Sequence, residues 1–324
     1  LRWNVDALPP MGSGLDPALL RRLLRAKDRM DAASEEEWPV ERLASVSGVS
    51  EAHFARSFKD AFGVPPHRYL LTRRIERAKA LLAAEQTVDP ARPAHSLHAY
   101  FLRGGSEDFE TDYKVERDFD GGSFSNRRVV ASQQGRPILN LTASFQKHEE
   151  GLHHVDAEMP QVPPPEELEP EVVARRRFAE QARPEARHHF LSPRPVEMRA
   201  VEGRHWMNPQ PAPPRSHSWF KTVAPLPDDP RIHRAVLAFT SDMTLLGTCA
   251  LPHGLSWARG EVVSASLDHA VWFHDQFRAD EWLLYATDSP WSGNGRGFNR
   301  GRIFTRDGRL VAPAARRAVD RFGR

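Results

Sequence analysis

The sequence predicts an α+β protein in which two similar subdomains pack together behind an all-helical segment. Apolar residues recur at the helical period up to about residue 85 and at the strand period of two in the later regions. The strand-like regions also contain a repeat, in which residues 96–101 are similar to 266–270 and residues 127–145 to 300–315. A duplicated unit implies two similar subdomains and favours a site at their seam.

Length and composition describe a multidomain globular chain. Its 324 residues exceed what one core usually supports and suit two or three domains. Charged residues make up 27%, the mean hydropathy is −0.57, and no run of about 18 apolar residues could span a membrane. The net charge of +2 favours no particular partner.

Cysteine usage points to the compartment. Cys249 is the single cysteine, so an intrachain disulfide is excluded, and the first residues lack the apolar segment of a secretory signal. A cytoplasmic location is therefore predicted. Cys249 itself is expected to be a small buried apolar residue.

The N-terminal region is typical of short helices. A helix from Pro39 to about Val46 is ended by Gly48, and Ser50 is a good N-cap for the next one. A further helix is predicted over residues 67–85, with Ile75, Ala78 and Leu82 among its inward residues. The helix after Ser50 carries one aromatic face, formed by Phe54, Phe58 and Phe62.

The rest of the chain alternates between strand pattern and one Pro-rich stretch. Strands are predicted at Arg127–Val130 and Ile138–Phe145, with Gly135-Arg136 as the turn between them and Gly308-Arg309 as its counterpart in the second repeat. A strand over Trp219–Val223 and a helix from Ile232 to about Leu246 precede the later strands. The predicted domains are residues 1–85 (helical), 86–147 (first repeat), 148–193 (a linker rich in Pro and charge) and 194–324 (second repeat, carrying the site).

Residues from about 15 to 80 resemble the first helix-turn-helix of the AraC-type transcription regulators. The resemblance rests on W-P-V-E-R-L-A-S-V-S-G-V-S-E-A-H-F-A-R-S-F-K-D-A-F-G-V-P-P-H-R-Y and the following L-L-T-R-R-I-E-R-A-K-A-L-L. It implies that the helix after Ser50 enters a major groove and that the next helix faces phosphates. The alternative is that these are solvated helix faces. The candidate DNA-contacting residues are His53, Arg56, Lys59, Arg73 and Arg74, with Arg77 and Lys79 also expected to face phosphates.

Members of that family carry a second helix-turn-helix, whereas this chain changes to strand pattern after Glu85. With one half-module and few phosphate contacts, DNA binding is expected to be weak.

Residues from about 80 to the end resemble the bacterial acyl-CoA thioesterase II family. The motifs are H-S-L-H-A-Y-F-L-R-G-G, S-F-S-N-R-R-V-V-A-S-Q-Q-G-R-P-I-L-N-L-T-A-S-F-Q, L-P-D-D-P-R-I-H-R-A-V-L-A-F-T-S-D, S-L-D-H-A-V-W-F-H and G-R-G-F-N-R-G-R-I-F-T-R-D-G-R-L-V-A. The resemblance implies a double hotdog, in which two long helices are each wrapped by a curved antiparallel sheet. It also implies hydrolysis of acyl-CoA without metal, cofactor or covalent intermediate, and a homo-oligomer.

The same resemblance implies that a carboxylate, a hydroxyl and a carboxamide hold one water. The carboxylate falls on Asp242 and the hydroxyl on Ser266. The carboxamide position holds Arg316, whose guanidinium has no acceptor. If Arg316 reached Asp242, it would lower the pKa of that carboxyl and make it a poorer base. Asp268 and His269 are expected to be structural, and Arg296 or Arg300 is a weaker candidate for CoA phosphates, with a solvated role as the alternative.

The first repeat departs from the family pattern, because helix-turn-helix sequence stands where the second repeat has its Trp219–Val223 strand. Either residues 73–85 serve as the central helix, or the first hotdog is incomplete and exposes part of its sheet. Three hypotheses follow: an acyl-CoA thioesterase impaired by Arg316, an AraC-type DNA-binding regulator with an acyl-CoA-binding hotdog domain, and a fusion product without function. Neither the preferred acyl chain length nor the oligomeric state follows from the sequence.

Overall fold

The structure is a computed structural model. It describes residues 19, 22, 23, 26, 40–50, 53, 54, 57, 66–103, 105, 109–181, 191, 194–203, 209–243, 245–255 and 262–322. Within these residues, side chains are described except at positions 40–42, 66–74, 181, 246, 262–265 and 318–322.

The helix-turn-helix segment begins as the sequence predicts. Helix α2 (Val40–Ser47) ends at Gly48, which adopts a φ of 61° that favours glycine. The next helix begins after Ser50, whose carbonyl accepts the N–H of Phe54 at 2.7 Å. Phe54 is fully buried. Phe58 and Phe62, the other residues of the predicted aromatic face, lie outside the described residues.

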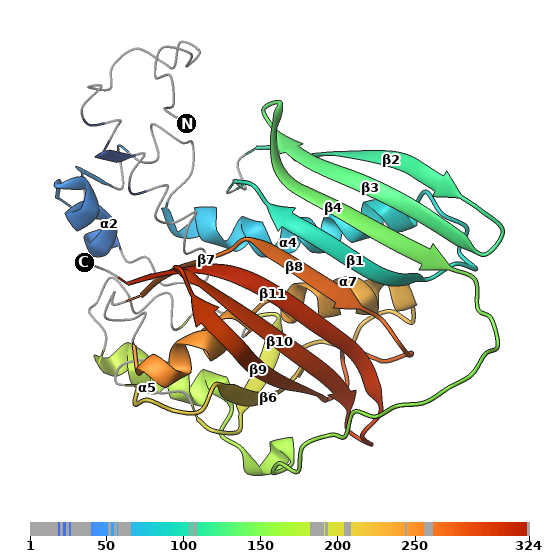
Figure 1. The fold of residues 1–324 in the computed structure, drawn as a ribbon. Coiled ribbons are helices and arrows are strands. Elements are labelled where there is room, and N and C mark those ends of the chain that lie inside the picture. Colours follow the sequence, from blue (N-terminus) through green and yellow to red (C-terminus); the bar gives the residue numbers. More distant parts are fainter. Residues whose placement is uncertain are drawn as a thin grey trace.

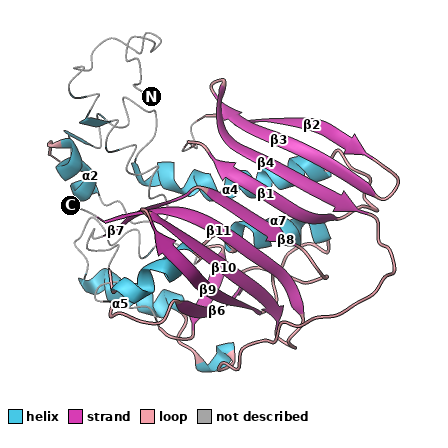
Figure 2. Cartoon of the chain, viewed as in Figure 1, coloured by secondary structure: helices cyan, strands magenta, loops and turns pink. Residues whose placement is uncertain are grey.

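All strands in the described part of the chain belong to one 11-stranded antiparallel sheet, which curves over the helices (Figure 2). Its order is β2-β3-β4-β1-β8-β11-β10-β9-β6-β5, and β7 pairs with β11. The strands are β1 (Ala94–Phe101), β2 (Asp112–Asp120), β3 (Phe124–Gln133), β4 (Arg136–Gln146), β5 (Val196–Ala200), β6 (Arg215–Thr222), β7 (Val262–Ser266), β8 (Asp268–Trp272), β9 (Leu283–Gly293), β10 (Arg296–Thr305) and β11 (Leu310–Phe322).

The two predicted repeats are each a four-stranded unit, β1 to β4 and β8 to β11, joined through antiparallel pairing of β1 with β8. Each unit has its predicted turn at the same place. Gln134 and Gly135, between β3 and β4, adopt φ values of 48° and 71°, and Gly308, between β10 and β11, adopts 93°. The sequence repeat is therefore a structural repeat.

Each unit wraps a helix, which confirms the double hotdog. Helices α4 (Pro66–Glu85) and α7 (Pro230–Thr240) lie side by side on one face of the sheet (Figure 1). Glu85 and Arg234 join them through an ion pair of 2.9 Å. The shared core contains Leu81 and Ala84 of α4, Leu237 of α7, and strand residues from both units. Residues 73–85 thus lie within a helix that serves as the central helix of the first hotdog.

The inward face of α4 matches the prediction only in part. Ala78 is buried as predicted, but Ile75 is 43% exposed, whereas Arg77, Leu81 and Ala84 are buried. Helical periodicity alone predicts that the apolar residues face the core. The helix is instead oriented by its packing against α7, which brings a charged side chain inward.

The first unit lacks an outer strand. In the second unit β6 and β5 extend the sheet beyond β9, whereas the sheet ends at β2 on the other side within the described residues. Charged residues along β2, among them Lys114, Glu116 and Asp118, are typical of an edge strand that avoids pairing with another chain.

The Pro-rich stretch packs on the outer face of the second unit. Met159, Val162 and Leu168 contact a small core around Trp219 and Phe304. Trp219 Nε1 donates to Pro163 O at 2.9 Å, and Arg306 pairs with Glu166 at 2.8 Å. The stretch also contains the short helix η2 (Pro165–Glu167) and helix α5 (Glu171–Gln181). No helix in the described parts of the chain is long and apolar enough to cross a membrane.

Candidate functional site

The site is built on the C-terminal end of α7. Asp229 caps the start of this helix and Pro230 occupies its first turn. The helix ends at Thr240, several residues before the predicted Leu246, and the chain continues through a turn into η3 (Leu246–His253). Asp242 follows directly after the helix and is 4% exposed. A carboxylate is thus buried at the seam of the two hotdogs.

Arg316 reaches this carboxylate from β11. Its Nη1 lies 2.7 Å from Asp242 Oδ1 and also donates to the Asp242 backbone oxygen at 3.0 Å. The Arg316 side chain is fully buried. The guanidinium therefore contacts both the helix end and the carboxylate that the sequence proposes as a base.

Arg77 is a second cation at the site, and sequence reasoning missed it. Its Nη1 lies 3.7 Å from Asp242 Oδ2, its guanidinium donates to Ala238 O, and it lies 5.7 Å from the Phe101 ring centre. The expectation that Arg77 faces DNA phosphates is wrong, because its side chain is fully buried on the face of α4 that packs against the sheet and α7. One sequence feature could have indicated that Arg77 points inward: its helix belongs to both the helix-turn-helix pattern and the hotdog pattern.

Neutral side chains hold the segment before Asp242. Tyr285 OH donates to Ser241 O at 2.8 Å, and burial raises the pKa of Tyr285, which keeps it a donor. Ser241 Oγ lies 3.3 Å from His269 Nε2. Burial lowers the pKa of His269 well below its usual value, and the nearby guanidinium of Arg77 acts in the same direction. His269 is therefore neutral at pH 7.

Ser266 lies close to Arg316 in the sheet register. Ser266 pairs with Ala318, two residues from Arg316 on β11, and both Ser266 and Arg316 are buried. Within the described residues the Ser266 hydroxyl makes no side-chain hydrogen bond. The neighbouring Asp268 accepts the Arg317 N–H at 2.7 Å. Asp268 thus has a structural partner at the start of β8.

The candidate DNA-contacting residues are only partly described. His53 is exposed on its helix. Arg56 and Lys59 lie outside the described residues, and Arg73 and Arg74 belong to α4 with side chains outside the described part. Lys79 is half-exposed and pairs with Glu76 at 3.4 Å.

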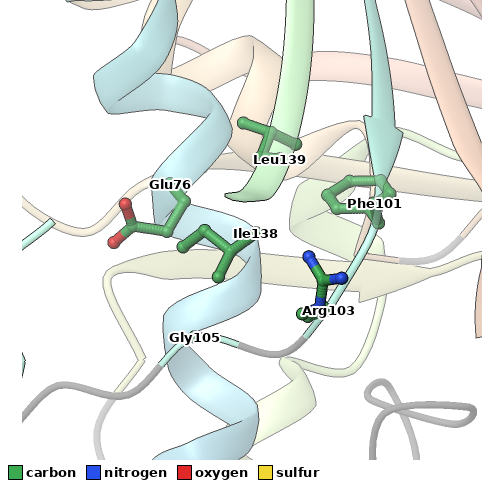
Figure 3. Close-up of a pocket in the computed structure, with 6 residues that line it drawn as sticks. All are labelled: Glu76, Phe101, Arg103, Gly105, Ile138 and Leu139. Carbon is green, nitrogen blue, oxygen red and sulfur yellow. The ribbon is translucent and has the colours of Figure 1, made fainter. Parts of the chain in front are cut away.

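A narrow pocket lies next to Phe101 (Figure 3), whose ring the Arg77 guanidinium also approaches. Glu76 of α4, Phe101 of β1 and Leu139 of β4 line it, and its volume of about 10 Å³ is enough for one water. A larger group would fit here only after side chains such as Phe101 and Ile138 move.

The fold defines a double-hotdog protein with a buried carboxylate at the seam, and comparisons with known proteins specify its family. Residues 78–146 match the acyl-CoA thioesterase N-terminal domain, and residues 185–319 match the acyl-CoA thioesterase family. Human acyl-coenzyme A thioesterase 8 is 36% identical over 250 residues, covering 75% of this chain and 78% of that protein. The chain belongs to the acyl-CoA thioesterase family.

Bacterial relatives point to the same family. Acyl-CoA thioesterase 2 of Haemophilus influenzae is 35% identical over 245 residues, covering 76% of this chain and 85% of that protein. The crystal structure of an acyl-CoA thioesterase II, TesB2, from Mycobacterium marinum matches with a TM-score of 0.64 and 40% identity, covering 78% of this chain and 91% of that one.

Residues 43–94 also match a helix-turn-helix domain. This match overlaps the thioesterase N-terminal match over residues 78–94, which include the buried end of α4. One helix is thus shared by two families, which explains why the sequence shows no break there.

Proposed function

We propose that this protein hydrolyses acyl-CoA to a free acid and CoA with a water held by Asp242 and Ser266. The observation that carries the proposal is the burial of the Asp242 carboxylate at the end of α7, at the seam of a fold shared with named acyl-CoA thioesterases. Ser266 supports it by its place beside Arg316 in the sheet register.

The reaction needs two proton transfers, one from the water to Asp242 and one back from Asp242 to the leaving group. Asp242 accepts a proton from the water, whose oxygen attacks the thioester carbonyl carbon. Ser266 orients the water, since a hydroxyl both donates and accepts. The tetrahedral intermediate breaks its C–S bond, and the leaving CoA thiolate takes up the proton that Asp242 accepted from the water, so Asp242 returns to its carboxylate form.

Arg316 is proposed to slow this reaction. The ion pair at 2.7 Å stabilises the carboxylate form of Asp242 and fills a position from which a carboxamide would both donate and accept. Arg77, at 3.7 Å, acts in the same sense. A poorly oriented water and a weakened base together are expected to cost about 10²-fold in kcat.

The proposal is tested by thiol release from a long-chain acyl-CoA. Asp242→Asn is expected to abolish turnover, and Ser266→Ala to lower kcat more than it changes KM. The exposed Asp118→Asn serves as a matched control with unchanged rate. Far-UV circular dichroism establishes that each variant is folded. Turnover that is unchanged in folded Asp242→Asn removes this residue from the mechanism.

A second candidate function rests on the helix-turn-helix match at residues 43–94. DNA would contact the helix that begins after Ser50, where His53 is exposed. Weak binding that falls steeply with salt is expected in a gel shift. If micromolar protein shifts no DNA at low salt, this function is excluded.

A further inference from the structure

A pocket of about 330 Å³ lies on the sheet face opposite to Asp242, and none of the residues proposed to act on the water lines it. Four residues of β9, β10 and β11 line it: Trp291, Arg296, Phe298 and Arg317. Adjacent residues of a strand point to opposite faces. Arg316 is buried towards Asp242, whereas Arg317 is exposed. The pocket is therefore separate from the carboxylate site.

Three of the residues that line this pocket lie in one row across neighbouring strands. Trp291 pairs with Phe298, and Phe298 pairs with Arg317, so the three side chains share a face. The pairing of β10 with β9 shifts in register between Phe298 and Arg300 of β10. Such a β-bulge redirects side chains. Ser289 Oγ fixes this bulge by donating to Phe298 O at 2.8 Å. The indole of Trp291 is 45% exposed.

The charges of the pocket favour an anion. Among the described residues neither the Arg296 nor the Arg317 side chain makes an ion pair, and no carboxylate lines the pocket. Arg300, on the same strand, differs because it pairs with Asp288 at 2.5 Å. Two guanidiniums facing one concave space attract and bind phosphate groups.

We propose that this pocket binds an adenine nucleotide, with its phosphates on Arg296 and Arg317 and its base stacked on Trp291. An indole face and two guanidiniums match a flat ring that carries phosphates. The volume falls within the range of small-molecule sites. The nucleotide end of coenzyme A and a free nucleotide share this chemistry.

Calorimetric titration of the full chain tests the proposal, with adenosine bisphosphate phosphorylated at the 3′ and 5′ positions as the probe. Binding that weakens with salt is expected. Arg296→Gln, Arg317→Gln and Trp291→Leu should each weaken it about tenfold. Arg300→Gln, whose guanidinium is occupied by Asp288, should bind as the wild type does. Thermal melts establish that the variants are folded.

Two further titrations identify the source of the ligand. If coenzyme A binds as tightly as the bisphosphate and ATP binds less tightly, the pocket holds the nucleotide end of coenzyme A. If ATP binds equally well, the pocket takes free nucleotides. No binding of any of these at millimolar concentration, or equal affinity in the two Arg variants and the wild type, overturns the proposal. Neither result bears on hydrolysis, because turnover is measured separately.

Discussion

Two guanidiniums share one buried carboxylate at Asp242, and this arrangement decides how the site tolerates substitution. Arg316 lies at 2.7 Å and Arg77 at 3.7 Å, and both side chains are fully buried. A buried charge that loses its partner is strongly destabilising. We therefore expect either guanidinium to compensate part of the Asp242 charge when the other is removed.

A double-mutant cycle tests that sharing. Arg77→Gln and Arg316→Gln are each expected to lower the free energy of unfolding in urea, and the double variant to lower it by about 1–3 kcal/mol more than their sum. The physical reason is that only the double variant removes both ion pairs of Asp242. Additive losses would show that the two side chains act independently.

The neutral His269 gives the protein a pH-dependent stability. Its folded-state pKa lies below the unfolded value, so between about pH 7 and 5 the unfolded chain binds a proton that the folded chain does not. The free energy of unfolding therefore falls as pH falls, with a slope of up to about 1.4 kcal/mol per pH unit for each such histidine.

The comparison of variants isolates the contribution of His269. His269→Gln should flatten the slope between pH 7 and 5 more than His95→Gln, because His95 is only partly buried, although burial lowers its pKa too. An unchanged slope in His269→Gln would contradict the assignment.

The sequence predicted which residues meet at the Asp242 site better than it predicted how the side chains around them pack. Asp242 and Arg316 were predicted from motif positions, and they lie in contact. Arg77 was assigned to the wrong surface, since no local pattern reports that α4 packs against α7. The roles of Asp242, Ser266 and Arg316 stay predictions.

Among the elements, β10 supports the end of α7 through one glycine. A Cβ at Gly301 would lie 2.7 Å from Tyr285 Cζ and 2.8 Å from its hydroxyl oxygen. A residue without a Cβ at position 301 leaves room for this ring, whose hydroxyl donates to Ser241 O. Gly301 is therefore a packing requirement of the site.

Gly301→Ala is expected to lower the free energy of unfolding by about 1–3 kcal/mol, because the Tyr285 ring must shift in a closely packed core. Gly122→Ala is the control, with no atom within 4 Å of the added Cβ, and should change stability by less than about 0.5 kcal/mol. Equal effects in the two variants would show that the Tyr285 contact is unimportant.

The ends of helices and strands could be predicted where a glycine in the sequence determines the turn. Gly48, Gly135 and Gly308 adopt the positive φ angles expected of turns and helix ends. The end of α7 was misplaced because apolar residues continue beyond Thr240. The helix stops there because tertiary donors such as Tyr285 and Arg316 take the carbonyls that follow it.

The molecule as a whole is expected to unfold as one unit. Pairing of β1 with β8 makes the sheet continuous, and one core contains α4 and α7 together. The internal repeat predicted this duplication, but not the pairing of β1 with β8. The predicted domain limits and self-association stay predictions.

Leu97→Ala tests the cooperativity. Leu97 is fully buried on β1, and its truncation should cost about 2–5 kcal/mol. Because the core is shared, urea transitions followed by circular dichroism and by tryptophan fluorescence should shift together. Two separated transitions would show that the hotdogs unfold independently.

The kcat of Arg316→Gln for a long-chain acyl-CoA tests most directly whether Arg316 restrains the site. We expect a rise of up to about 10²-fold, because glutamine frees Asp242 and supplies both a donor and an acceptor to the water. The exposed Arg302→Gln should leave kcat unchanged, and Asp242→Asn in the Arg316→Gln background should abolish the rise. A folded Arg316→Gln protein with unaltered kcat would contradict the claim that this arginine restrains the site.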